Sequence, residues 1–182
     1  MKAKINKVTV RLTRESVLAV ETAGIVNATD PNLSLPPELV AKAGVEVVRE
    51  TTVIGWCDVG SAVMTTAGNL AAEKIIHTVG PRWGEGSERG KLANAIHECL
   101  RLAEDNRLKS IAMPAISTGA MGYPLENCAT TTISQIVDFT FEDLKHLRTI
   151  ILCLSDKLTY EAFEREFGQQ IEELRQSGAA AV

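Results

Sequence analysis

Short apolar segments rich in β-branched residues alternate with longer amphipathic segments along the chain. The short segments predict strands at residues 7–12, 23–28, 62–65, 74–79, 110–116 and 149–154. The apolar residues around Ile25-Val26, Ile75-Ile76 and 111–116 run continuously instead of alternating with polar ones, which is typical of strands that are buried on both faces. The pattern therefore predicts a sheet that is covered by helices on both sides.

Helical periodicity fills the intervals between the predicted strands. Pro36-Pro37 followed by Glu38 indicates a helix start, because proline is tolerated in the first turn and an acid suits the N-terminal dipole. Apolar residues at helical spacing mark a second helix: Leu92, Ala95, Ile96, Cys99, Leu100 and Ala103. Two more helices are predicted at 125–141 and 159–175. We expect a single α/β domain of three layers at residues 1–176, followed by a frayed C-terminal tail at 177–182.

Composition narrows the class of protein. A chain of 182 residues with 45% hydrophobic residues is large enough for one domain with its own core. Its 19 basic residues are outnumbered by 23 acidic ones, which argues against a dedicated nucleic-acid binder. No apolar run approaches the roughly 18 residues of a membrane-spanning helix, and no signal-peptide segment follows the first lysines, so no membrane partner is expected.

The four cysteines are Cys57, Cys99, Cys128 and Cys153, and their wide spacing contains no C-x-x-C motif. This arrangement favours free thiols in a reducing, cytoplasmic compartment. It gives no indication of a zinc site, and the sequence suggests no other metal or cofactor.

The strand predicted at 110–116 runs into a small turn with the sequence Ser117-Thr118-Gly119-Ala120-Met121-Gly122-Tyr123-Pro124. Pro124 indicates that a helix begins directly after the turn. Gly119 and Gly122 allow the backbone to approach a ligand closely or to adopt positive φ. Exposed N–H groups at a helix start attract anions, so a phosphate could bind here without any Lys or Arg. The same pattern also fits an ordinary strand-to-helix turn.

Asn27 lies at the end of the strand predicted at 23–28. Ligands of open α/β sheets gather at the carboxyl ends of strands, so the Asn27 amide is a candidate for hydrogen bonds to a sugar hydroxyl. The alternative is that Asn27 and Asp30 only cap and turn the chain. His77 lies inside an apolar strand, a position more typical of a satisfied core histidine than of a catalyst.

Three motifs together resemble the macro domain family: Ile25-Val26-Asn27-Ala28, Ile76-His77-Thr78-Val79-Gly80-Pro81, and Pro114-Ala115-Ile116-Ser117-Thr118-Gly119-Ala120-Met121-Gly122-Tyr123-Pro124. They occur in family order with family-like spacing, and the resemblance covers about residues 5–170. The last motif is the most specific of the three. The resemblance implies an α/β fold, a three-layer α/β/α sandwich with a central mixed, mostly parallel sheet, and a cleft for ADP-ribose and its relatives.

The resemblance also implies roles for individual residues. Asn27 would contact the distal ribose, the one beyond the diphosphate. Backbone amides of the turn would wrap the diphosphate, and the residues concerned are Ser117, Thr118, Gly119, Ala120, Met121 and Gly122. Oriented N–H dipoles would then attract the anionic ligand in place of net positive charge. No catalytic residue is identified, and Asn27 and Asp30 are the candidates.

The first phosphate loop departs from the family pattern. Members usually carry G-G-G-V followed by a small or acidic residue soon after the strand-end asparagine, whereas this chain has Asp30-Pro31-Asn32-Leu33-Ser34-Leu35-Pro36-Pro37-Glu38. Two prolines remove backbone donors where the family directs amides at a phosphate. In hydrolytic members an acid in this loop helps to activate water or to position the scissile bond, and here only Asp30 or Glu38 could substitute.

The adenine end of the expected cleft departs as well. Members commonly have an aspartate near the N-terminus that accepts a hydrogen bond from the adenine amine, and here Glu15 is the stand-in. The aromatic residue that often flanks adenine after the last strand is replaced by Ser155. The aromatic residue of the diphosphate turn is replaced by Met121, whose side chain can still cover a ribose face.

Three functional hypotheses follow. We favour a module that binds ADP-ribose or a related nucleotide, free or attached to a protein, without efficient hydrolysis. The alternative is a hydrolase that removes ADP-ribose from proteins, or an acetyl group or 1″-phosphate from ADP-ribose. General acid–base help is worth about 10²–10⁴-fold, so loss of the loop acid would lower activity without abolishing binding. The third hypothesis is a macro fold that binds another nucleotide, RNA or a protein. The oligomeric state is left open.

Overall fold

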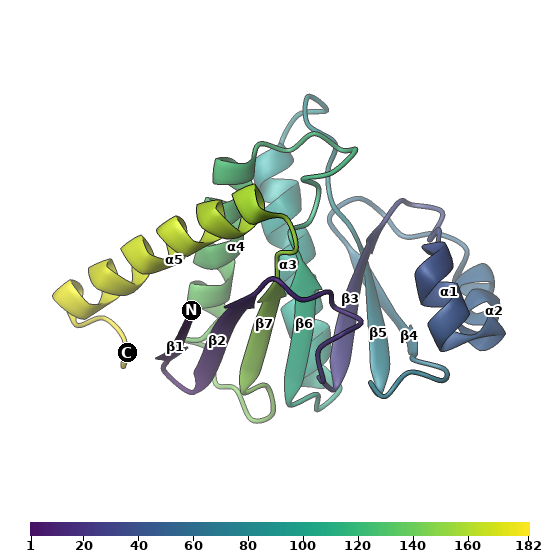
Figure 1. Cartoon of the computed structure of the whole chain (residues 1–182), viewed down its shortest axis with the longest axis horizontal. Helices are drawn as coiled ribbons and strands as arrows, with labels where there is room; N and C mark the ends of the chain where they lie inside the picture. The colour runs from purple at the N-terminus through teal and green to yellow at the C-terminus, as the bar shows by residue number, and fades with distance from the viewer.

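A computed structural model describes all residues, 1–182, and its centre is one seven-stranded sheet in the order β1-β2-β7-β6-β3-β5-β4 (Figure 1). The strands are β1 (Lys2–Ile5), β2 (Val8–Thr13), β3 (Gly24–Thr29), β4 (Ala62–Thr66), β5 (Lys74–Val79), β6 (Ser110–Pro114) and β7 (Thr149–Cys153). Strands β2, β7, β6, β3 and β5 are parallel, whereas the two edge strands β1 and β4 are antiparallel to their neighbours. The sheet is therefore mixed and mostly parallel, as predicted.

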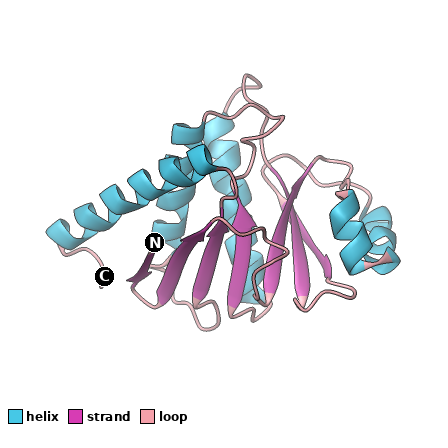
Figure 2. Ribbon diagram, in the orientation of Figure 1, coloured by secondary structure: helices cyan, strands magenta, loops and turns pink.

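Five helices cover the two faces of this sheet (Figure 2). They are α1 (Pro37–Ala43), α2 (Val45–Ile54), α3 (Glu88–Asp105), α4 (Leu125–Phe139) and α5 (Lys157–Ser177). The larger core lies between the sheet and α3, α4 and α5, whereas a smaller core lies under α1, α2 and the segment 17–20. This is the three-layer α/β/α sandwich that the sequence predicts.

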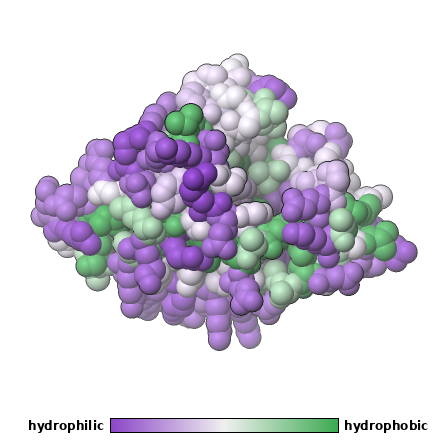
Figure 3. Space-filling model, viewed as in Figure 1, coloured by the Kyte–Doolittle hydropathy of each residue, from purple (hydrophilic) through white to green (hydrophobic).

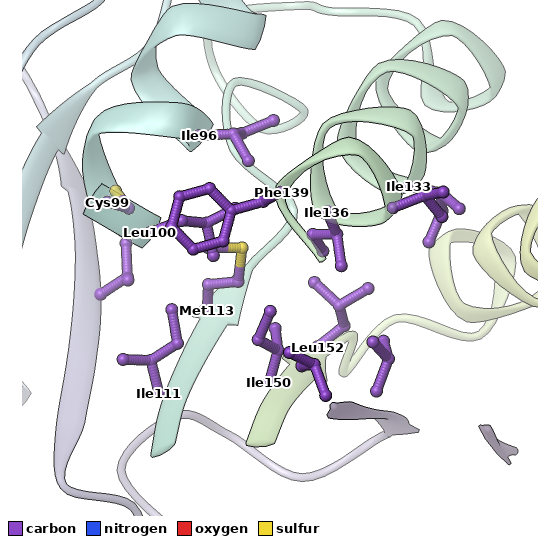
Figure 4. Packing of buried hydrophobic residues seen from close by; sticks show 14 of the residues in the cluster. Ile96, Cys99, Leu100, Ile111, Met113, Ile133, Ile136, Phe139, Ile150 and Leu152 are labelled. Atoms are coloured by element: carbon purple, nitrogen blue, oxygen red, sulfur yellow. The ribbon is translucent and has the colours of Figure 1, made fainter. Parts of the chain in front are cut away.

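The continuous apolar runs of the central strands are explained by these two cores. Val26 and Ile76 enter the larger core, and their neighbours Ile25 and Ile75 enter the smaller one. Figure 4 shows the larger core, in which side chains from β6 and β7 meet side chains from α3 and α4. Successive residues of a strand point to opposite faces, so a strand that is covered twice must be apolar at every position.

The predicted strands and helices are all present, with ends that differ by one or two residues. The strand predicted at 110–116 ends at Pro114, which leaves Ala115 and Ile116 to the turn. Two elements were not predicted. β1 was missed because Lys2 and Lys4 interrupt a short edge strand, and α2 was missed because it continues from α1 after a break at Gly44, where φ is +95°.

The C-terminal tail is held in place, in contrast to the frayed end that its composition suggested. Helix α5 continues to Ser177, beyond the predicted end at 175. The Asn6 amide donates a hydrogen bond of 2.7 Å to the Ala181 carbonyl, and the Ala181 amide donates to Asn6 Oδ1 at 3.2 Å. The tail is thus tied to the β1–β2 hairpin.

Hydrophilic residues predominate on the face of the molecule shown in Figure 3. Hydrophobic residues gather near α1 and α2 at the right-hand end of this view, and α2 has Val45, Val53 and Ile54 among its exposed apolar side chains. None of the five helices combines the length and the apolar character needed to cross a membrane.

Candidate functional site

A cleft lies where β3 and β6 diverge. These neighbouring strands pair only at their beginnings, Gly24 with Ile111 and Ile25 with Ala112. After β3 the chain turns to α1 on one face of the sheet, whereas after β6 it turns to α4 on the opposite face. A crevice opens at such a topological switch point, outside the carboxyl ends of the strands. Here it encloses about 410 Å³.

Nineteen residues line this cleft, and they come from four segments of the chain. The stretch before β3 contributes Ser16–Leu18, and β3 with the loop that leads into α1 contributes Ile25–Thr29, Pro36, Glu38 and Leu39. Gly80 follows β5, and the end of β6 with the turn after it contributes Pro114–Ser117 and Gly119–Met121. Glu38 is the only charged residue among them. A ligand would therefore meet mainly apolar side chains and backbone groups.

The turn after β6 presents a row of free backbone donors. The amides of Thr118, Gly119, Ala120 and Met121 donate no hydrogen bond within the protein. The turn closes on itself through Gly122 N–H to the Gly119 carbonyl, at 3.0 Å. Successive unpaired N–H groups form a concave site of positive potential, which suits a phosphate oxygen.

The segment after β5 fixes the orientation of this turn. The Trp83 amide donates to the Met121 carbonyl at 2.9 Å, and the Arg82 guanidinium donates to the Ala120 carbonyl at 3.4 Å. The ring of Trp83 packs edge-on against Tyr123, with 5.0 Å between centroids. Because carbonyls of the turn are bound from outside the cleft, its amides stay free for a ligand.

Ser117 begins the turn in an unusual state. Its backbone has φ of +67°, in the left-handed region that disfavours a residue with a side chain. Its hydroxyl is buried and has no hydrogen-bond partner. Buried polar groups without partners and strained backbone both concentrate at functional sites, so Ser117 is a sign of a ligand position.

Asn27 reaches the cleft from the end of β3 and is held by the neighbouring strand. Its Nδ2 lies 3.1 Å from Nδ1 of His77, and Nε2 of His77 lies 2.9 Å from the Thr65 hydroxyl. Burial lowers the pKa of His77 to about 4, whereas Glu50 acts weakly in the opposite direction. His77 is therefore a neutral, satisfied core histidine, as predicted, and it also contacts a residue of the cleft.

The loop after β3 uses its donors internally. The Asp30 carboxylate accepts hydrogen bonds from the amides of Asn32 and Ser34. A hydrogen bond with the Ser34 side chain lowers the pKa of Asp30, and the two amide bonds lower it further. The Leu33 amide donates to the Asp30 carbonyl. Asp30 does not line the cleft, whereas Glu38 does. The two carboxylates that sequence analysis offered as loop acids are thus separated into a loop cap and a cleft residue.

The structure brings together some of the predicted site residues and separates others. Asn27, Ser117, Gly119, Ala120 and Met121 line the cleft. Thr118 and Gly122 belong to the same turn but are not among the residues that line the cleft. Glu15 and Ser155 lie outside it, and the Ser155 carbonyl accepts a hydrogen bond from Arg14.

Sequence analysis missed the wall formed by Ser16, Val17 and Leu18 and the floor at Gly80. The wall had no motif that could reveal it, because an irregular segment lacks periodicity. Gly80 could have been found, because Gly80-Pro81 ends the second of the three motifs. A Cβ at Gly80 would overlap the Ser117 hydroxyl and the Ile116 side chain, so only glycine lets the end of β5 approach the turn.

Comparison of sequences identifies relatives. The family model of the Macro domain matches residues 26–132. A protein of Sulfurisphaera tokodaii, described only as uncharacterised, is 36% identical over 171 residues, which are 89% of this chain and 92% of that protein. The O-acetyl-ADP-ribose deacetylase of Salmonella typhimurium is 42% identical over 118 residues, which are 64% of this chain and 65% of that enzyme.

Comparison of structures agrees. The Oceanobacillus iheyensis macrodomain with ADP superposes with a TM-score of 0.89 at 26% identity, over 95% of this chain and 97% of that one. The Trypanosoma brucei macrodomain in complex with ADP-ribose has a TM-score of 0.79 at 27% identity, over 86% and 68% of the two chains. Fold, sequence motifs and relatives agree, and the chain belongs to the macro domain family.

Proposed function

We propose that this chain binds ADP-ribose, free or attached to a protein, in the cleft between β3 and β6. The observation that carries the proposal is the row of four free amides in the turn 118–121, because three of these residues line a cleft that has no cationic side chain. Such a row suits the diphosphate, because each N–H can donate to a phosphate oxygen in a site that excludes part of the water.

Different residues of the cleft suit the adenine and the distal ribose of this ligand. Val17, Leu18 and Leu39 form an apolar wall that an adenine ring can cover. Asn27 offers an amide to the hydroxyls of the distal ribose, and Met121 is the side chain of the turn available to cover that sugar. Glu15 and Ser155, the sequence-based candidates for adenine, lie outside the cleft and have no part in this proposal.

Titration with ADP-ribose tests the proposal directly. Ligand at 100 times its dissociation constant should stabilise the protein by about 2.7 kcal/mol. For a domain of this size we expect a rise in melting temperature of roughly 5–10 °C with ADP-ribose. No heat on calorimetric titration and no thermal shift at millimolar ADP-ribose would overturn the proposal.

Gly119→Val separates binding from folding. A Cβ at Gly119 meets no atom of the protein within 4 Å, and the position does not require positive φ. The added side chain should therefore leave the melting temperature of the free protein unchanged but obstruct a diphosphate on the turn amides. We expect ADP-ribose affinity to fall at least about tenfold, the effect of losing one charge-assisted hydrogen bond. An unchanged affinity would place the diphosphate elsewhere.

Hydrolysis of O-acetyl-ADP-ribose is the second candidate function. It is favoured by the presence of Glu38 in the cleft and by the relatives named as deacetylases of that compound. Glu38 is exposed and lies 3.3 Å from Lys42, so its carboxylate is available to a water molecule at the cleft. Acetate release should be followed in the wild type and in Glu38→Gln. Release that persists unchanged in the variant would exclude Glu38 as its general base.

A cytoplasmic location is part of the same proposal. All four cysteines are buried and form no disulfide, which is the usual state of thiols in a reducing compartment.

A further inference from the structure

A chain of hydrogen bonds connects the cleft to the edge of the sheet. It runs from Asn27 on β3 through His77 on β5 to Thr65 on β4. Asn27 is the register partner of His77, and Thr65 lies diagonally across from it, two residues after its partner Val63. The Thr65 hydroxyl also donates to the Thr66 carbonyl at 2.9 Å. The Glu50 carboxylate on α2 accepts hydrogen bonds from the amide and the hydroxyl of Thr66. These bonds hold the β4 end of the hydrogen-bond network in place.

One assignment of protons satisfies every bond of this network as the structure places the Asn27 amide. The Asn27 NH₂ group lies against Nδ1 of His77, and an amide nitrogen can only donate, so Nδ1 accepts. The Thr65 oxygen then accepts from Nε2 while its own proton goes to the Thr66 carbonyl. Nε2 of His77 therefore carries the proton of the neutral ring, and Nδ1 is an acceptor. An Asn27 oxygen facing Nδ1 would meet a second acceptor.

This arrangement leaves the Asn27 carbonyl oxygen for the cleft. Asn27 is buried apart from 8% of its surface, and it lines the cleft. Its Oδ1 accepts no hydrogen bond from the protein. The Ser117 hydroxyl is the only fully buried polar side-chain atom without a partner, so Asn27 Oδ1 is not fully buried. Oδ1 is consequently accessible from the cleft and unoccupied by any protein donor.

We propose that His77, oriented by Thr65, is a positioning residue that holds the Asn27 amide with its oxygen toward the cleft, so that this point of the site selects a ligand hydroxyl that donates. The inference rests on the proposed function and adds a direction to it. A sugar hydroxyl that keeps its proton is accepted here. A position on the sugar that offers only an acceptor, such as an ether or ester oxygen, is rejected because two acceptors would face each other.

The test compares ADP-ribose with ADP, which lacks the distal ribose, by calorimetric titration of five variants. His77→Leu removes the acceptor at Nδ1 and frees the Asn27 amide to rotate. We expect it to weaken ADP-ribose binding about tenfold while ADP binding changes less than about twofold. In an Asn27→Ala background the same substitution should cost no further ADP-ribose affinity, because the residue through which it acts is gone.

Thr65→Val and His77→Asn complete the set. Thr65→Val keeps the shape of a buried side chain but removes the partner of Nε2, so it should weaken ADP-ribose binding in the same direction as His77→Leu. His77→Asn places an amide oxygen close to the position of Nδ1 and should restore most of the affinity. Either variant keeps the inference testable if the leucine variant does not fold.

A readout without ligand is also available. Long-range ¹H–¹⁵N correlation of the His77 ring in the free protein reports which nitrogen is protonated, and we expect Nε2–H. Observation of Nδ1–H would overturn the inference, as would equal losses for ADP and ADP-ribose or additive losses in the double variant. If the wild type binds neither nucleotide, the proposed function fails together with this inference. If the wild type binds ADP-ribose but the variants give the results just named, only the inference about His77 fails.

Discussion

The neutral imidazole of His77 makes folding sensitive to mildly acidic pH. Its pKa is about 4 in the folded protein against 6.5 ordinarily, because burial disfavours the charged form. The unfolded chain therefore binds a proton as pH falls below about 6.5, and the folded protein does not until about pH 4. Stability from this group is complete above pH 6.5, declines through this window and should be lower by about 3 kcal/mol near pH 4.

Urea unfolding of the wild type and of His77→Asn at pH 7 and pH 4.5 measures this effect. The difference in unfolding free energy between the two pH values should shrink in the variant, because asparagine at position 77 binds no proton. Carboxylates with lowered pKa values, such as Asp30 and Asp156, lose their contribution mainly below this window and serve as a common background. An identical difference in both proteins would contradict the assignment.

Gly80 should tolerate no larger residue. A Cβ there would overlap the Ser117 hydroxyl and the Ile116 side chain, so Gly80→Ala forces the turn away from β5. We expect a loss of about 1–3 kcal/mol in chemical denaturation, the usual cost of overpacking, together with weaker ADP-ribose binding. Gly90→Ala is the matched control. It lies in α3 with no atom near its Cβ position and should stabilise the protein by up to about 1 kcal/mol.

At the scale of elements, Glu104 joins helix α3 to the segment before β7. Its carboxylate accepts hydrogen bonds from the amides of Lys145, His146 and Leu147. These bonds lower the pKa of Glu104 in spite of its partial burial. Their contribution is present above the ordinary pKa of a glutamate and is lost as pH falls through the lowered value.

Glu104→Ala should therefore destabilise the protein by about 2 kcal/mol at pH 7, since three amides lose a charged acceptor and those of His146 and Leu147 belong to half-buried and buried residues. Glu98→Ala in the same helix is the control. Glu98 pairs with Arg101 on the surface of α3, and such a pair contributes at most about 0.5 kcal/mol. Equal effects of the two substitutions on the midpoint of urea unfolding would contradict the role of Glu104.

The predicted helices and strands are those with strong hydrophobic periodicity. The two elements that were not predicted, β1 and α2, lack a clear pattern of their own. Apolar runs such as Ile75-Ile76 are typical of central strands in a covered sheet. The boundary between α1 and α2 was not predicted because Gly44 breaks a helical pattern without a change in polarity. The free amides of the turn could be predicted from its glycines. Their orientation could not, because it depends on Trp83 and Arg82, which are remote in sequence.

Side-chain roles in the loop after β3 could not be predicted for a related reason. Asp30 and Glu38 are both carboxylates in one polar segment, and only the fold of that segment decides which one faces the cleft. The Asp30 bonds to Asn32 and Ser34 are short-range, but nothing in the residue types distinguishes a capping aspartate from a catalytic one.

At the scale of the whole molecule, the two ends of the chain are fastened together on the β1 side of the sheet. Besides the bonds between Asn6 and Ala181, the N-terminal amine lies 3.4 Å from the Tyr160 hydroxyl, and Ala180 packs against the larger core. Figure 1 shows both ends beside β1. The C-terminal residues are therefore part of the folded structure.

Removal of residues 178–182 should lower the unfolding free energy by about 1–2 kcal/mol, because the two hydrogen bonds with Asn6 and the apolar contact of Ala180 are lost. Amide hydrogen exchange at Asn6 should become faster in the shortened protein, while exchange in β6 should follow only the global change. Removal of Val182 alone is the control and should have little effect. An unchanged urea midpoint after the longer truncation would show that the tail contributes nothing.

The position of the chain ends has a practical consequence. The cleft lies between β6 and β3, and strands β2 and β7 separate it from β1, where both ends are found. A tag, a dye or a solid support attached through either end would stand to the side of the nucleotide entrance without covering it. If the cleft holds ADP-ribose as proposed, the protein can be immobilised through either end and used to capture ADP-ribosylated material. Gly119→Val would be the inactive control.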